Sequence, residues 1–109
     1  GSNECPDWYQ NLDFRASKPV SVDYAIEIMK ESLGCYNGRY SYNRFEPYLI
    51  ARTNEFFTGH KILLAREGSV CIYVVGGRKK GDWDDEDITL RLHADEAMPT
   101  EIGYRIWWD

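Results

Sequence analysis

The sequence predicts an α+β fold in which one α-helix packs on a four- to five-stranded, mostly antiparallel sheet. One segment, residues 22–33, repeats apolar residues at helical spacing, whereas most of the chain after it forms short β-branched or apolar runs between turn residues. The 109 residues are 43% hydrophobic and 15% aromatic, a composition that supplies one core. We therefore expect a single compact domain over residues 3–109, preceded by Gly1 and Ser2 as the remnant of a purification tag.

The predicted helix has suitable residues at both ends. Ser21 is a good N-cap residue, and Asp23 places a negative charge in the first turn, where the helix dipole favours it. Gly34 suits a left-handed C-terminal cap. The apolar face is predicted to consist of Val22, Ala25, Ile26, Met29 and Leu33.

The first strands are predicted on both sides of this helix. The aromatic-rich residues 7–16 can supply a short strand, and residues 39–51 predict a strand that Pro47 interrupts or marks as an edge. Residues 60–66 and 70–75 are apolar and joined by only three residues, so we expect them to pair as the centre of an antiparallel sheet.

The later elements are predicted to be a long polar loop and two further strands. The loop covers residues 76–87. Residues 88–93 alternate apolar and polar side chains, which predicts a strand with one buried face. A loop around Pro99 leads to a last strand over residues 102–108, in which one of the adjacent Trp107 and Trp108 faces the core and the other is available to a partner.

The polar loop joins a basic run, Arg78 to Lys80, to an acidic run, Asp82 to Asp87. The simpler interpretation, which carries the greater weight, is a solvated loop whose opposite charges pair with one another. The alternative is a partner-binding surface anchored by Trp83, because exposed tryptophan beside charge is typical of binding hot spots. The candidate partner-binding residues are Arg78, Lys79, Lys80, Trp83, Asp84, Asp85 and Trp108.

Composition and motifs argue against several classes of function. The net charge of −5 disfavours nucleic acid and anionic membranes as partners, and no apolar run is long enough to span a membrane. We expect no cofactor and no metal, because the glycines do not match a nucleotide-binding loop, the acidic run lacks the spacing of a calcium loop, and the histidines are not spaced with the cysteines. We expect no catalytic residues; the enzyme alternative is a small ribonuclease that uses His93 beside Arg91.

The three cysteines, Cys5, Cys35 and Cys71, allow one disulfide and one free thiol. A bridge from Cys5 to Cys35 or to Cys71 would tie the N-terminal segment to the domain by closing a long loop. The alternative is three reduced thiols in a cytosolic protein, with Cys71 a small core residue. We favour the disulfide and therefore a secreted protein.

The order of elements resembles small secreted effectors of plant-pathogenic fungi, in particular the RNase-like effectors of cereal powdery mildews. The resemblance rests on Cys5-Pro6-Asp7-Trp8-Tyr9, on a helix followed by a strand from Tyr40 to Pro47, and on further antiparallel strands. The segment Gly68-Ser69-Val70-Cys71-Ile72-Tyr73-Val74 is similar also to killer-toxin-like secreted proteins. The chain ends Trp107-Trp108-Asp109, without the C-terminal cysteine usual in the RNase-like family, and no catalytic set matches its positions.

These resemblances imply a non-catalytic secreted effector, acting outside the cell or after delivery into host cells. Its expected partner is a host protein or immune receptor, with RNA as the other partner known for the family. The alternative function is an acidic inhibitor or immunity protein that neutralises a basic toxin or nuclease, and the ribonuclease is the second alternative.

Overall fold

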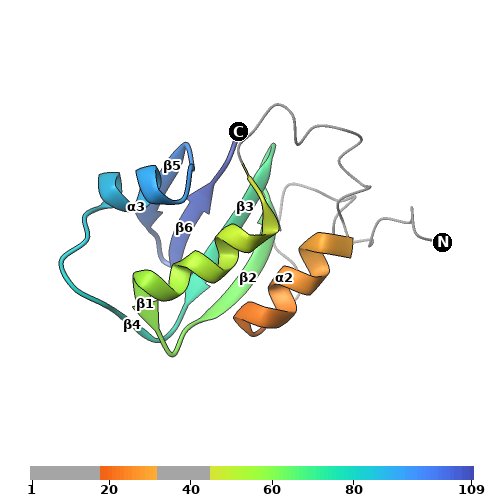
Figure 1. Cartoon of the computed structure of the whole chain (residues 1–109), viewed down its shortest axis with the longest axis horizontal. Helices are drawn as coiled ribbons and strands as arrows, with labels where there is room; N and C mark the ends of the chain where they lie inside the picture. The colour runs from red at the N-terminus through yellow and green to blue at the C-terminus, as the bar shows by residue number, and fades with distance from the viewer. Residues whose placement is uncertain (1–17, 32–44) are drawn as a thin grey trace.

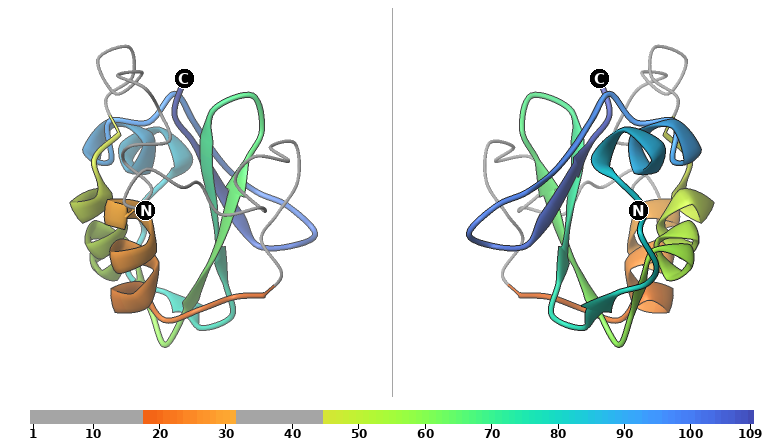
Figure 2. Two further views of the ribbon diagram at one scale, coloured as in Figure 1. Left: turned by 90° about the vertical axis from the view of Figure 1, so that its right-hand side faces the viewer. Right: turned by 90° about the vertical axis from the view of Figure 1, so that its left-hand side faces the viewer.

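A computed structural model of the protein describes residues 18–31 and 45–109, which are coloured in Figure 1. A four-stranded antiparallel sheet has the strand order β2-β3-β6-β5, and β1 and β4 form a separate two-stranded sheet. Figure 2 shows the helices on one side of the larger sheet. The α+β class is therefore confirmed. The described elements in chain order are α2 (Val22–Glu31), the 3₁₀-helix η3 (Pro47–Glu55), β1 (Phe57–Thr58), β2 (Lys61–Arg66), β3 (Val70–Val75), β4 (Arg78–Lys79), α3 (Asp85–Arg91), β5 (Glu96–Pro99) and β6 (Tyr104–Trp107).

Helix α2 begins where the sequence predicts. The hydroxyl oxygen of Ser21 accepts a hydrogen bond from the Tyr24 backbone N–H at 3.1 Å, which satisfies one of the free donors of the first turn. Ala25 and Met29, four residues apart, are buried in the core on the helix side of the sheet. The predicted end of this helix, the Gly34 cap and the strand expected over residues 7–16 lie outside the described residues.

The predicted antiparallel pairing of residues 60–66 with 70–75 is confirmed as the hairpin of β2 and β3, with Leu64 opposite Ile72. Its predicted place at the centre of the sheet is wrong for β2, which is an edge strand, because the C-terminal strand β6 pairs with the other side of β3. The loop expected around Pro99 is instead the edge strand β5, where a proline that cannot donate to a neighbouring strand is tolerated.

The strand predicted for residues 48–51 is wrong, because these residues belong to η3. Pro47 lies in the first turn of η3, where the backbone N–H groups have no partner within the helix, so the N–H that proline lacks is not needed there. Leu49, Ile50 and Thr53 are buried, which is the spacing of one helical face rather than of a strand. The part of the predicted strand before Phe45 lies outside the described residues.

The strand predicted for residues 88–93 is also wrong, because residues 85–91 form helix α3. Asp84 caps this helix, since its side chain accepts a hydrogen bond from the Asp87 backbone N–H at 2.8 Å. Ile88 and Leu92 are fully buried, whereas the side chain between them, Leu90, is 69% exposed. The buried residues are four positions apart, as on one face of a helix. In a strand, Leu90 would point to the same side as Ile88 and Leu92 and would be buried with them.

The two-stranded sheet continues the hairpin of β2 and β3 beyond a bend. Phe57 pairs with Lys79 and Lys61 with Val75, so the two pairs are four positions apart on each strand and neither strand has an extra residue. At the bend, between β1 and β2 at the bottom of Figure 1, Gly77 packs against the opposite strand. A Cβ atom at Gly77 would lie 2.4 Å from the Thr58 carbonyl oxygen, and its φ is +67°, so this position requires glycine. The predicted polar loop over 76–87 therefore contains β4 and the start of α3.

The two faces of the larger sheet differ in composition. The face toward the helices is apolar and includes Ile62, Ile72, Ile106 and the fully buried Trp108. The opposite face combines the buried residues Leu63, Ala65, Cys71 and Tyr73 with the partly buried Arg105 and Trp107. In the described ranges, no helix is long and apolar enough to cross a membrane.

Candidate binding surface

The two charged runs of the sequence lie on neighbouring structural elements. The basic segment (Arg78, Lys79 and Lys80) consists of β4 and the residue after it, and the acidic segment (Asp82 and residues 84–87) leads into the first turn of α3. All of these side chains are exposed. Lys80 is fixed at its base and tip, because its backbone N–H donates to the Phe56 carbonyl at 2.7 Å and its Nζ donates to the Asn54 carbonyl at 2.9 Å.

The two charged segments do not neutralise each other. Among residues 18–31 and 45–109, ion pairs join Arg91 to Glu55 and Arg105 to Glu67 and Glu96, and none joins the basic to the acidic segment. Two acidic side chains have structural roles, since Asp84 caps α3 and Asp85 accepts a hydrogen bond from the Tyr104 hydroxyl at 2.6 Å. The structure thus departs from the simpler interpretation, in which the opposite charges pair.

Trp83 lies within the acidic segment, between Asp82 and the Asp84 cap of α3, and is partly buried. Its ring contacts the edge of Phe56, with centroids 5.2 Å apart, and the Arg91 guanidinium lies over it at 4.6 Å. The indole N–H groups of Trp107 and Trp108 donate to backbone carbonyls at 2.8 Å. The indole N–H of Trp83 has no such acceptor within the described part of the chain, so its ring is anchored while its donor is free.

Arg91 belongs to the same surface, in a role that the sequence did not predict. Its guanidinium stacks on Trp83, and its nearest carboxylate, Glu55, is 3.9 Å away, with both side chains about half exposed. Arg52 of η3 donates to the Arg91 carbonyl at 2.8 Å, which gives a hydrogen-bond partner to one of the carbonyls at the C-terminal end of α3. This hydrogen bond joins residues 39 positions apart and depends on two helices that the pattern predicted as strands.

Trp108 is not part of this surface. It is fully buried, its indole N–H donates to the Leu92 carbonyl at 2.8 Å, and its ring contacts Phe45 edge-on with centroids 4.8 Å apart. The expectation that one of the two adjacent tryptophans faces the core is correct, but the core residue is Trp108, because it lies on the same side of the sheet as the buried Ile106. The candidate binding surface is therefore made of the basic segment, Trp83, Arg91 and the acidic segment.

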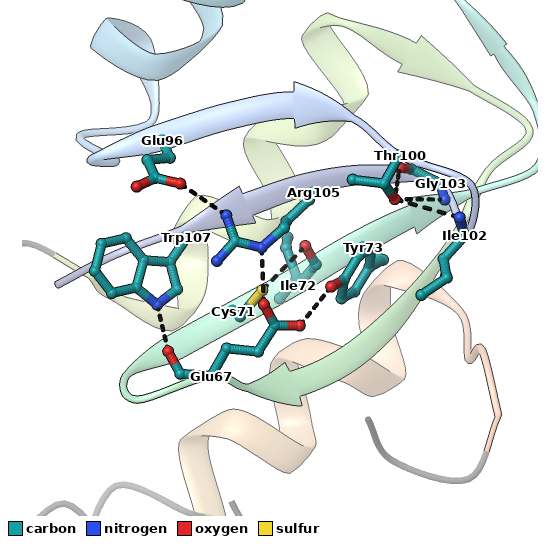
Figure 3. Close-up of polar contacts among 10 residues, drawn as sticks. All are labelled: Glu67, Cys71, Ile72, Tyr73, Glu96, Thr100, Ile102, Gly103, Arg105 and Trp107. Atoms are coloured by element: carbon teal, nitrogen blue, oxygen red, sulfur yellow. Dashed lines mark hydrogen bonds and ion pairs between the residues drawn. The ribbon is translucent and has the colours of Figure 1, made fainter. Parts of the chain in front are cut away.

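The opposite sheet face contains a second arginine, Arg105, in a closed network (Figure 3). Its Nε donates to Glu67 at 2.8 Å and its Nη1 to Glu96 at 2.9 Å. Burial disfavours the charge on Arg105, but these hydrogen bonds outweigh burial and hold its pKa above the usual range. Tyr73 donates its hydroxyl hydrogen to Glu67, and burial together with this bond raises the pKa of Tyr73 to about 12.

Cys71 is a free and fully buried thiol on this face. Burial raises its pKa to about 12, so the thiol is neutral and a poor nucleophile near neutral pH. A bridge between Cys5 and Cys71 is therefore not formed in this structure. The other predicted pairing, Cys5 with Cys35, lies outside the described residues.

The histidines do not form the arrangement on which the ribonuclease alternative was based. His93 follows α3 in a turn with φ of 55° and is exposed, rather than lying on a strand beside Arg91. His60 is buried, and its Nε2 lies 2.7 Å from the Thr53 hydroxyl oxygen. No group of three metal-ligating side chains occurs in the ranges that the structure describes.

Comparison with known proteins adds no relative. No family model matches the chain, and neither a curated protein nor a solved structure matches it.

Proposed function

We propose that the protein is a non-catalytic binding module that recognises a protein partner through the surface around Trp83. The observation that carries the proposal is the state of this tryptophan. Its ring is held by Phe56 and Arg91, while its indole N–H remains available to an acceptor on the partner. Tryptophan and arginine are the side chains most enriched among residues that dominate binding energy at protein interfaces.

The charges around Trp83 support a protein partner rather than nucleic acid. Two groups of opposite charge flank Trp83: the first is the basic segment together with Arg91, whose guanidinium lies over the ring, and the second is the acidic segment on both sides of Trp83 in the sequence. The net charge of the chain is −5. A phosphate backbone would be attracted to the first group and repelled by the second. A protein surface can present charges of both signs at matching positions.

The biological role that we propose is that of a secreted effector, as the resemblance to fungal effectors implies. Because Cys71 is free, counting the cysteines that are alkylated in the unfolded, unreduced protein tests directly whether the protein comes from an oxidising compartment, as a secreted effector would. One alkylated cysteine would support a bridge between Cys5 and Cys35 and an oxidising environment. Three alkylated cysteines would contradict the disulfide and the secreted role that depends on it.

The binding proposal is tested by capturing a partner on the immobilised protein and measuring its affinity for variants. Trp83→Phe keeps a ring against Phe56 but removes the indole N–H, and we expect affinity to fall about tenfold, the worth of one hydrogen bond. Lys61→Glu, at an exposed position on β2, is the control and should bind like the parent. Equal affinity of the parent and Trp83→Phe for the captured partner would contradict the proposal.

Charge reversals decide between an effector and an acidic inhibitor. The exposure of Asp82 and Glu86, which have no partner in the described residues, favours the inhibitor as a second candidate. Loss of affinity in Asp82→Lys/Glu86→Lys, with binding that weakens steeply with salt, would indicate an inhibitor of a basic toxin or nuclease. Loss in Arg78→Glu/Lys79→Glu would assign the binding to the basic segment. RNA turnover by the parent that His93→Ala abolishes would instead establish the ribonuclease.

A further inference from the structure

His60 occupies the bend between the two sheets and is only 8% exposed. The Thr53 hydroxyl donates its hydrogen to the Ile50 carbonyl at 2.7 Å, so it must accept the hydrogen bond that it shares with His60. The proton of the neutral ring is therefore on Nε2, and Nδ1 is a bare acceptor. Nδ1 is buried and has no hydrogen-bond partner.

Among the described residues, the contacts of the ring are with neutral groups. η3 contributes the hydroxyl of Thr53, and β1 contributes Phe57 with its ring centroid 5.8 Å away. Tyr104 of β6 lies beyond Phe57 and donates its hydroxyl hydrogen to Asp85 of α3. Burial lowers the pKa of His60 below its ordinary value of 6.5, and no charged group of the described residues contributes to this shift.

The position of His60 gives its protonation a structural consequence. The backbone at residue 60 is packed against Gly77: a Cβ atom added at Gly77 would lie 2.6 Å from the backbone nitrogen of His60. The ring of Phe57 lies between those of His60 and Tyr104. If the His60 ring left its buried site to reach water, it would therefore disturb these contacts, which hold β1 and β4 in line with the hairpin of β2 and β3.

We propose that the bend is an acid-sensitive joint, in which proton uptake by Nδ1 of His60 loosens the two-stranded sheet and the basic segment that follows it. The opened joint exposes His60 to water, where it binds a proton more readily than in the closed joint. Opening is therefore favoured as the pH falls from 6.5 toward the lower pKa of the closed state, and does not increase further below that pKa. Within this window the equilibrium for opening rises by up to about tenfold per pH unit.

The experiment is amide hydrogen exchange followed by NMR, corrected for the intrinsic effect of pH, on the free protein. It needs no partner, so its outcome is independent of the proposed binding function. The reporter is the Lys80 amide, bonded to the Phe56 carbonyl at 2.7 Å, and the reference is the Trp108 amide, bonded to the Val70 carbonyl at 2.9 Å. We expect acid to reduce the protection of Lys80 by up to about tenfold per pH unit, while that of Trp108 changes little.

Two variants isolate the cause. His60→Gln keeps an amide donor for Thr53 but cannot take up a proton, so the acid response of Lys80 should disappear. His93→Gln changes the exposed histidine and should keep the response. Direct titration of the His60 ring in the parent protein provides a test that does not depend on whether a variant folds. A midpoint at or above 6.5, or equal loss of protection at Lys80 and Trp108, would overturn the proposal.

Discussion

Two arginine–tryptophan pairs in the described part of the protein are chemically alike and structurally different. Arg105 lies near Trp107 at 5.8 Å, its side chain is 16% exposed, and two carboxylates accept its hydrogen bonds. Arg91 lies over Trp83 at 4.6 Å, its side chain is 55% exposed, and its one carboxylate neighbour is at 3.9 Å. The indole N–H of Trp107 is bonded to the Glu67 carbonyl, whereas that of Trp83 has no acceptor among the described residues.

This difference separates a pair that holds the fold from a pair that remains available to a partner. Residues from β3, β5, β6 and the β2–β3 turn meet at Arg105, so the network joins neighbouring strands (Figure 3). Arg91 and Trp83 join α3 to η3 mainly by stacking, which leaves the edges of the guanidinium and of the indole free to donate. Residue type alone therefore does not distinguish a pair whose donors are engaged within the fold from a pair with donors available to a partner; the hydrogen bonds of each pair do.

The largest expected effect on stability is at Arg105. Arg105→Met removes the cation and leaves Glu67 and Glu96 close together without it, so we expect a loss of about 3 kcal/mol in the free energy of unfolding, measured with urea. Binding by the fraction that remains folded should be unchanged. A loss below about 0.5 kcal/mol, as for an ordinary surface ion pair, would contradict the structural role of this pair.

A smaller effect is expected at Tyr73, because Glu67 keeps its bond from Arg105 when the tyrosine hydroxyl is removed. Tyr73→Phe should cost about 1.5 kcal/mol at neutral pH. In the parent, Tyr73 keeps its proton in the folded state up to a pKa of about 12, whereas the unfolded chain loses it above about 10. Stability should therefore fall as pH rises from 10 to 12, and should fall less steeply in Tyr73→Phe. Cys71 and Tyr104 titrate in both proteins, so equal slopes would contradict this assignment.

The smallest effect on stability is expected at Arg91, which is the reverse of its expected effect on binding. Arg91→Met keeps an apolar side chain over Trp83 and removes an exposed ion pair, so the free energy of unfolding should change by less than about 0.5 kcal/mol. Affinity for the captured partner should fall several-fold. If Arg91→Met lowered stability as much as Arg105→Met, the contrast between the two pairs would be lost.

The sequence predicted the elements whose local pattern and packing agree. The helix start at Ser21 has a cap residue before apolar residues at helical spacing, and the hairpin of β2 and β3 has two apolar runs joined by a short turn. Buried and partly buried residues alternate along the C-terminal strand. It failed at residues 88–93, because apolar residues two positions apart fit a strand while Ile88 and Leu92 also fit a helix. The Asp84 cap and the acidic first turn were the local information that favoured the helix.

The candidate surface was predicted in part. Trp83 and the charged segments follow from composition and spacing alone, but the role of Trp108 depended on which side of β6 faces the helices. Arg91 was predicted only as a neighbour of His93, because its contact with Trp83 requires α3 to be a helix. The Arg105 network joins residues up to 38 positions apart, and no local pattern reports such contacts.

The most direct test of the contrast is to add the captured partner to isotopically labelled protein and follow the side-chain N–H signals of both pairs by NMR. We predict that the Arg91 Nε–H and the Trp83 indole N–H shift as the complex forms, while those of Arg105 and Trp107 stay in place. Shifts confined to Arg105 and Trp107, or a complex that moves neither pair, would contradict the assignment of the binding surface to Trp83.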